Sequence, residues 1–210
     1  MEHTPREIQA FRYWIQGYAN FYEPIVVEYF RVTGYRLVHR PASVGQADIQ
    51  RVIDALFDGQ RKLGSEEAAR AMIQHLKSRR RLQPDSLLEK GGQYYLAEFK
   101  SWGGFGSGVF DLATLDSEFI RRPERGAFFL IDWLDGAPIA GKFLVVSARS
   151  GEHEQVLARL CQAYQTEAQL LYLDEIFRTP QLAGTIDAQL RYLDAAVAEI
   201  RQTLGRTAGD

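Results

Sequence analysis

Three ionisable residues with the types needed for hydrolytic chemistry stand near one another in the chain. Asp85 precedes a short apolar run, and Glu98 and Lys100 fall in a second run, "YYLAEFK". Between the runs lies Gly91-Gly92, a pair suited to the positive φ angles of a two-residue hairpin loop. Counting outward from that loop predicts that Asp85 lies directly opposite Glu98 on paired strands, with Lys100 on the same face.

Two opposed carboxylates repel each other, so this pairing asks for a neutralising partner. A Mg²⁺ ion, with Mn²⁺ as a substitute, fits because it needs only one or two protein carboxylates and keeps water on its other positions. An ion held by Asp85 and Glu98 could stabilise charge on a phosphate and make hydroxide from water. Lys100 could orient that water or neutralise developing negative charge. The alternative is purely structural: Asp85 begins a turn after Pro84, and Lys100 neutralises two exposed acids.

The hydrophobic periodicity predicts the elements that would hold these residues. Helices are expected over 5–33, with a new start near Asn20 that Glu23 would cap, and over two stretches within 46–81. A helix is also expected before Arg122, and others over 152–164 and 186–204. Beside the hairpin, strands are expected over 35–41, 126–133, 141–149 and 168–177. Trp133 is expected in the core.

This order predicts an α/β fold with a mixed β-sheet and helices on both faces. With 210 residues, the chain fits a single domain over 1–210 in which 46–81 forms a helical insertion between the first strand and the hairpin. No apolar run is long enough for a membrane span, and the first residues lack a signal-peptide pattern. A cytoplasmic protein with no membrane partner is therefore expected. A net charge of −2 means that a polyanion would have to meet a local basic patch.

The hairpin resembles the signature of the PD-(D/E)xK nuclease superfamily, with Pro84-Asp85 followed by Glu98-Phe99-Lys100. The context is similar to Mrr-like restriction endonucleases in three places. These are "YEPIVVEYFRVTGYRLV" from Tyr22, "YYLAEFKSW" from Tyr94 and "LLYLDEIF" from Leu170. The resemblance does not cover 46–81.

The resemblance implies a restriction-endonuclease-like fold and assigns roles to matching residues. Asp85 and Glu98 correspond to the metal ligands, and the main-chain carbonyl of Phe99 is a further candidate ligand. Lys100 corresponds to the catalytic lysine. Glu23 corresponds to an acid on the first helix near the metal, although it also has the spacing of a helix-capping residue.

Two further stretches are candidates for contact with nucleic acid. The first is a basic run, Lys77, Arg79, Arg80 and Arg81, which would otherwise be a solvated helix end favoured by the helix dipole. The second is the glycine-rich loop Gly103–Gly108, in which Gly104 and Gly106 would allow a close approach to a phosphate backbone. Plain loop flexibility explains the glycines equally well.

Together these features predict a magnesium-dependent nuclease that hydrolyses phosphodiester bonds, with DNA favoured over RNA because the resemblance points to DNA enzymes. Two alternatives stay open. One is a nucleic-acid-binding or assembly protein that keeps the fold with a weakened site, and the other is a nucleotide-binding protein that uses the Gly103–Gly108 loop. A homodimer is compatible with the nuclease, since cutting both strands is easiest with two sites.

Overall fold

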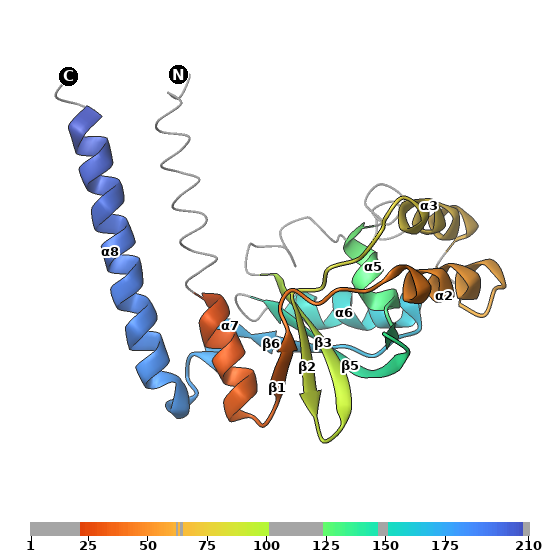
Figure 1. Cartoon of the computed structure of the whole chain (residues 1–210), viewed down its shortest axis with the longest axis horizontal. Helices are drawn as coiled ribbons and strands as arrows, with labels where there is room; N and C mark the ends of the chain where they lie inside the picture. The colour runs from red at the N-terminus through yellow and green to blue at the C-terminus, as the bar shows by residue number, and fades with distance from the viewer. Residues whose placement is uncertain (1–21, 62, 64, 101–123, 147–150, 208–210) are drawn as a thin grey trace. The chain divides into compact units, whose positions relative to one another are not determined.

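The computed structural model describes residues 22–61, 63, 65–100, 124–146 and 151–207 (Figure 1). The chain divides into two compact units. One consists of Gly34–Asp174, and the other combines Met1–Thr33 with Glu175–Asp210. Each unit is described by itself below.

The first unit contains a six-stranded mixed sheet, counted over the described residues. Its strands are β1 (Arg36–His39), β2 (Ser86–Lys90), β3 (Gln93–Lys100), β4 (Trp133–Leu134), β5 (Ala137–Val146) and β6 (Gln169–Tyr172). The neighbours β1, β2 and β3 are antiparallel, whereas β3, β5 and β6 run parallel. The short β4 pairs in antiparallel fashion with the beginning of β5, and β6 pairs with its end. The expected mixed α/β class is confirmed.

Helices supply the rest of the first unit's core. They are α2 (Gln46–Phe57), α3 (Glu66–Lys77), α5 (Glu124–Leu130) and α6 (Gly151–Tyr164), and the short α7 (Leu173–Ile176) follows β6. Leu96, Leu144 and Val146 lie on one face of the sheet, because paired residues of parallel strands share a face. They belong to one buried apolar cluster with residues of all four longer helices.

The two helices expected within 46–81 are confirmed as α2 and α3. Ser65 caps α3, since its hydroxyl accepts a hydrogen bond of 3.1 Å from the backbone N–H of Ala68. Ile53 of α2 and Met72 of α3 are buried in the same cluster as the sheet. The segment is therefore part of the main core rather than a separate appendage.

The second unit is helical over its described part. Residues 22–32 form a helix, and the expected stop at Gly34 is confirmed by its φ of 90°. A short 3₁₀ turn, Pro180–Leu182, leads into α8 (Ala183–Thr207), which confirms the final helix expected from residue 186. None of the described helices is long and apolar enough to cross a membrane.

Three sequence-based expectations for the strands were wrong. The stretch 126–133 is mostly the helix α5, because a short apolar run such as "AFFLI" has no period that separates strand from helix. Trp133 is 42% exposed rather than buried, since it lies on the two-residue strand β4 under the guanidinium of Arg51. The strand expected over 168–177 ends at Tyr172, where α7 begins.

Candidate functional site

The hairpin between β2 and β3 has the register that its glycine pair predicts. Gly91 and Gly92 have φ angles of 60° and 79°, the left-handed conformation that a tight two-residue loop needs. Lys90 pairs with Gln93, and Ser86 pairs with Ala97. Continuing that ladder by one residue places Asp85 opposite Glu98.

Asp85 and Glu98, called the acid pair below, each accept a hydrogen bond from a backbone N–H at the open end of the hairpin. The backbone N–H of Phe99 donates to Asp85 Oδ2 at 2.6 Å. The backbone N–H of Asp85 donates to Glu98 Oε2 at 3.3 Å. Each carboxylate therefore contacts the main chain of the opposite strand, and both side chains are half-buried.

Pro84 explains why the ladder gives way to side-chain bonds at this point. The register places it opposite Phe99, but proline has no N–H to donate. Its carbonyl accepts instead from the backbone N–H of Ala42 at 2.9 Å. The Asp85 carboxylate then accepts the Phe99 N–H bond, which brings the carboxylate over β3 and toward Glu98.

The acid pair lies where the parallel strands end. Lys100 is the last residue of β3 and pairs with Val146, the last residue of β5, which in turn pairs with Tyr172 at the end of β6. In open α/β sheets this carboxyl edge is the usual place for ligands. The backbone of Lys100 is thus two residues beyond Glu98 on the same strand, and its side chain lies outside the described part of the structure.

The acid pair has the donor chemistry that a small hard cation requires. A carboxylate offers about four lone-pair positions, so a hydrogen bond to one oxygen leaves room for a metal at the same group. Mg²⁺ needs only one or two carboxylates and fills its other positions with water and phosphate oxygens. Among the described residues no three His, Cys, Asp or Glu side chains converge as a metal cage. Asp85 and Glu98 supply two carboxylates, the number that an open Mg²⁺ site with water on its other positions would use.

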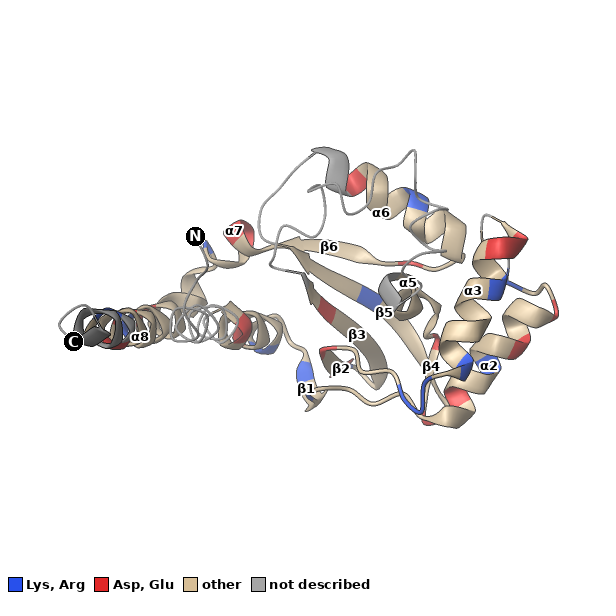
Figure 2. Ribbon diagram, turned by 90° about the horizontal axis from the view of Figure 1, so that it is seen from above, with Lys and Arg blue, Asp and Glu red and all other residues tan. Residues whose placement is uncertain are grey.

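The other predicted site residues fall in different places. Glu23 lies half-buried on the helix 22–32, which belongs to the other compact unit. Gly104 and Gly106 lie outside the described residues. Lys77, Arg79, Arg80 and Arg81 are all exposed and form a basic stretch as the chain leaves α3 (Figure 2).

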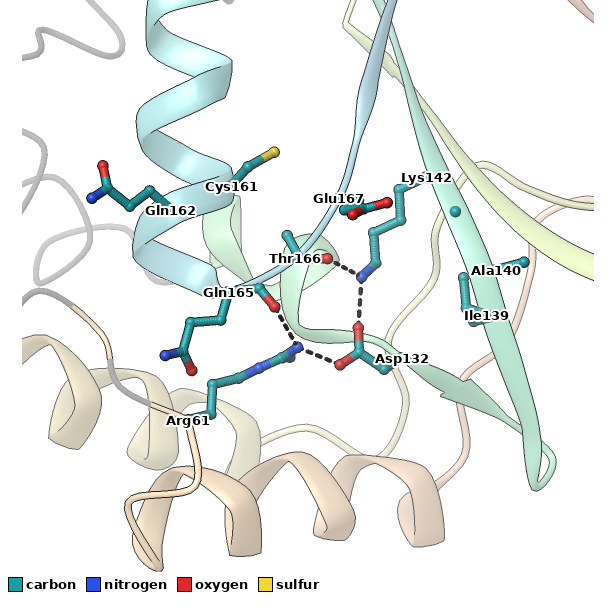
Figure 3. Close-up of a pocket in the computed structure, with 11 residues that line it drawn as sticks. Arg61, Asp132, Ile139, Ala140, Lys142, Cys161, Gln162, Gln165, Thr166 and Glu167 are labelled. Carbon is teal, nitrogen blue, oxygen red and sulfur yellow. Dashed lines mark hydrogen bonds and ion pairs between the residues drawn. The ribbon is translucent and has the colours of Figure 1, made fainter.

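A second polar cluster, which the sequence did not predict, lies in the first unit beside a cavity of about 480 Å³ (Figure 3). We call it the lysine clamp, and its members are Arg61, Asp132, Lys142 and Thr166. The ammonium group of Lys142 donates to Asp132 Oδ1 at 2.7 Å, to Thr166 Oγ1 at 2.6 Å and to the Phe129 carbonyl at 3.1 Å. Arg61 binds the other carboxylate oxygen of Asp132 and the Leu130 carbonyl.

The lysine clamp has the properties of a structural ion cluster. Lys142 is only 3% exposed, and burial lowers its pKa even though Asp132 acts in the opposite direction. All three ammonium hydrogens have acceptors within the protein. Cys161 also lines the cavity, and burial raises the pKa of its thiol, which disfavours the reactive thiolate. The clamp thus ties the loop after α2 to β5 and to the start of β6.

Searches of protein-family models, curated proteins and solved structures found no match to this chain.

Proposed function

We propose that this protein is a metal-dependent nuclease that hydrolyses phosphodiester bonds of DNA, on a restriction-endonuclease-like fold. The observation that carries the proposal is the acid pair: the hairpin register sets Asp85 and Glu98 across from each other at the carboxyl edge of a mixed sheet, and Lys100 follows two residues further along β3. Two carboxylates directly opposed on paired strands repel each other, and a bound cation would offset that repulsion.

Asp85 and Glu98 would hold the cation, with the Phe99 main chain next to them. A bound divalent ion would lower the pKa of a water molecule and offset charge on the phosphate. Backbone groups orient the two carboxylates: the Phe99 N–H binds the Asp85 carboxylate, and the Asp85 N–H binds the Glu98 carboxylate. Lys100 is assigned the stabilisation of negative charge that develops as water attacks the phosphorus in line with the leaving oxygen.

One observation favours a second candidate, a nucleic-acid-binding protein in which the acid pair serves only to close the hairpin. Asp85 accepts the hydrogen bond of the Phe99 N–H, which has no acceptor from Pro84 in the ladder. Glu98 accepts the hydrogen bond of the Asp85 N–H, which lies beyond the end of the ladder. In that case the pair would be retained for stability, and metal would change nothing.

Cleavage assays separate the two candidates. Plasmid and single-stranded DNA are incubated with Mg²⁺, Mn²⁺ or EDTA, using the wild type, Glu98→Gln and the control Glu89→Gln. Glu89 is an acid of the same hairpin that bonds Arg36 and the loop N–H of Gly92, away from the strand end. The nuclease proposal expects cleavage in Mg²⁺ by the wild type and the control, and none in EDTA or by Glu98→Gln. Absence of metal-dependent cleavage on all substrates would favour the binding protein.

A further inference from the structure

Four exposed cations at the end of α3 differ from the other basic side chains of the first unit. Lys77, Arg79, Arg80 and Arg81 make no ion pair and no side-chain hydrogen bond within the described part of the chain. By contrast, three other exposed arginines of this unit meet acids: Arg36 binds Glu89, Arg51 lies near Asp48, and Arg70 lies near Glu66. The run therefore concentrates unneutralised positive charge on a chain whose net charge is −2.

The helix dipole accounts for only part of this run. Lys77 lies in the last turn of α3, where a cation is favoured. Arg79, Arg80 and Arg81 lie beyond the C-cap Ser78, and the dipole effect falls off within the last turn. Three of the four charges thus lack a structural reason within the helix.

The backbone of the run is held in a fixed place. The N–H of Arg79 donates to the Leu76 carbonyl at 3.0 Å, which closes the end of α3. The Gln46 side-chain amide donates to the Arg79 carbonyl at 3.3 Å, which ties the run to the start of α2. The arginine side chains therefore project from a defined position rather than from a loose linker.

An antiparallel ribbon connects this position with the acid pair. Leu82 and Val44 exchange two backbone hydrogen bonds, of 2.9 and 3.2 Å, and Ala42 donates to Pro84 at 2.9 Å. The ribbon continues the pairing of β1 with β2 beyond the sheet. Since an extended chain rises about 3.3 Å per residue, the Cα atoms of Arg81 and Asp85 are at most about 13 Å apart.

We propose that the basic run and the acid pair form one path for a DNA strand, in which Arg79, Arg80 and Arg81 bind phosphates on one side of the bond that is cut. This inference rests on the proposed nuclease function and adds the direction and length of its substrate contact. One strand of duplex DNA advances about 3.4 Å along the axis per phosphate, so the ribbon spans at most about four nucleotides. The ribbon acts as a spacer that fixes the offset between the anchored phosphates and the reacting one.

The test uses end-labelled duplex DNA whose strongest cut is first mapped with the wild type in Mg²⁺. Neutral methylphosphonate linkages then replace single phosphates at each position on both sides of that cut. The triple variant Arg79→Ala/Arg80→Ala/Arg81→Ala is compared with Arg36→Ala/Arg51→Ala/Arg70→Ala, which removes the same charge from arginines that face acids. Binding is measured by anisotropy in EDTA over a range of salt concentrations.

The path predicts that the wild type and the control lose cleavage when a phosphate within about four nucleotides on one side of the cut is neutral. The triple variant should be insensitive at that position, and its salt-dependence slope should fall by up to about 2.7 because three phosphate contacts release their counterions. Cleavage by the wild type with no difference between the two triple variants would overturn the path and leave the nuclease standing. Absence of any cleavage by the wild type would overturn both.

Discussion

The acid pair and the lysine clamp are built on the same face of the sheet, yet the protein treats their charges in opposite ways. Register places Leu96 beside Lys142 and Glu98 beside Leu144, so two buried leucines separate the clusters. In the clamp a buried ammonium group meets three acceptors, one of which is the Asp132 carboxylate that it shares with Arg61. In the acid pair, two half-buried carboxylates of like charge meet two backbone N–H groups. The first arrangement holds cations and a carboxylate in direct contact, whereas the second brings two carboxylates to neutral backbone donors.

The comparison predicts that the free energy of unfolding depends more on the clamp than on the acid pair. It also predicts that any change in stability on adding metal depends more on the acid pair than on the clamp. Asp132→Ala should have the largest effect on folding, since it leaves Lys142 and Arg61 without their shared carboxylate. Removing one partner of a buried pair costs about 3–5 kcal/mol, and the lower end is expected because Asp132 is 39% exposed. Urea unfolding gives the free energy directly.

The control for that measurement is Glu66→Ala, which removes an acid at 4.0 Å from Arg70 on the exposed face of α3. Its unfolding midpoint should be almost unchanged, because exposed pairs contribute little. Equal losses for Asp132→Ala and Glu66→Ala would show that the clamp is an ordinary surface ion pair.

Metal should stabilise the fold through the acid pair. At a Mg²⁺ concentration of about 100 times its Kd, binding to the native state adds about 2.7 kcal/mol. Thermal melts with Mg²⁺ and with EDTA should show this gain for the wild type and Glu89→Gln, and not for Glu98→Gln. A Mg²⁺ response that survives in Glu98→Gln would place the ion elsewhere.

Variants of Asp85 separate its structural role from its chemical one. Asp85→Ala removes the acceptor of the Phe99 N–H and should cost about 1–2 kcal/mol. Asp85→Asn retains a side-chain oxygen that can accept this bond, so it should fold with nearly wild-type stability. Both variants should fail to cleave DNA, because alanine provides no ligand for Mg²⁺ and the amide of asparagine is a poor one. An active Asp85→Asn would reduce Asp85 to its role in the hairpin.

The smallest expected effect is a pH dependence of the clamp. Burial lowers the pKa of Lys142 in the folded state below its ordinary value of 10.5. Between those two values the unfolded chain binds more protons, so this group's contribution to stability rises with pH. The difference in unfolding free energy between wild type and Lys142→Met should therefore shift in favour of the wild type as pH rises toward 10.5. A shift in the opposite direction would mean that Lys142 is stabilised as a cation.

The sequence predicted the hairpin register that sets Asp85 opposite Glu98, but it missed the clamp. The reason is the distance along the chain over which each arrangement is determined. The hairpin register follows from Gly91-Gly92 and from alternation within a few residues, both of which are local. The clamp joins Arg61, Asp132, Lys142 and Thr166, whose meeting depends on how helices pack on the sheet. The only local sign was a lysine next to the apolar run "FLVV" in a buried strand.

The misassigned element has a similar cause. "AFFLI" is long enough for a buried strand and for more than one helical turn, and its packing against α3 and α6 decides in favour of the helix α5. Helices with a cap and a clear period, such as α3 after Ser65, were predicted correctly because their signals are local.

Lys100→Ala tests the central claim most directly. Single-turnover cleavage of labelled DNA and a Mg²⁺ titration are measured on the same preparation of wild type and variant. A cation cannot ligate Mg²⁺, so the account predicts an unchanged Mg²⁺ midpoint together with a cleavage rate lower by about 10²–10³, the usual cost of one electrostatic group in a transition state. Cleavage by Lys100→Ala at the wild-type rate would contradict the proposed mechanism.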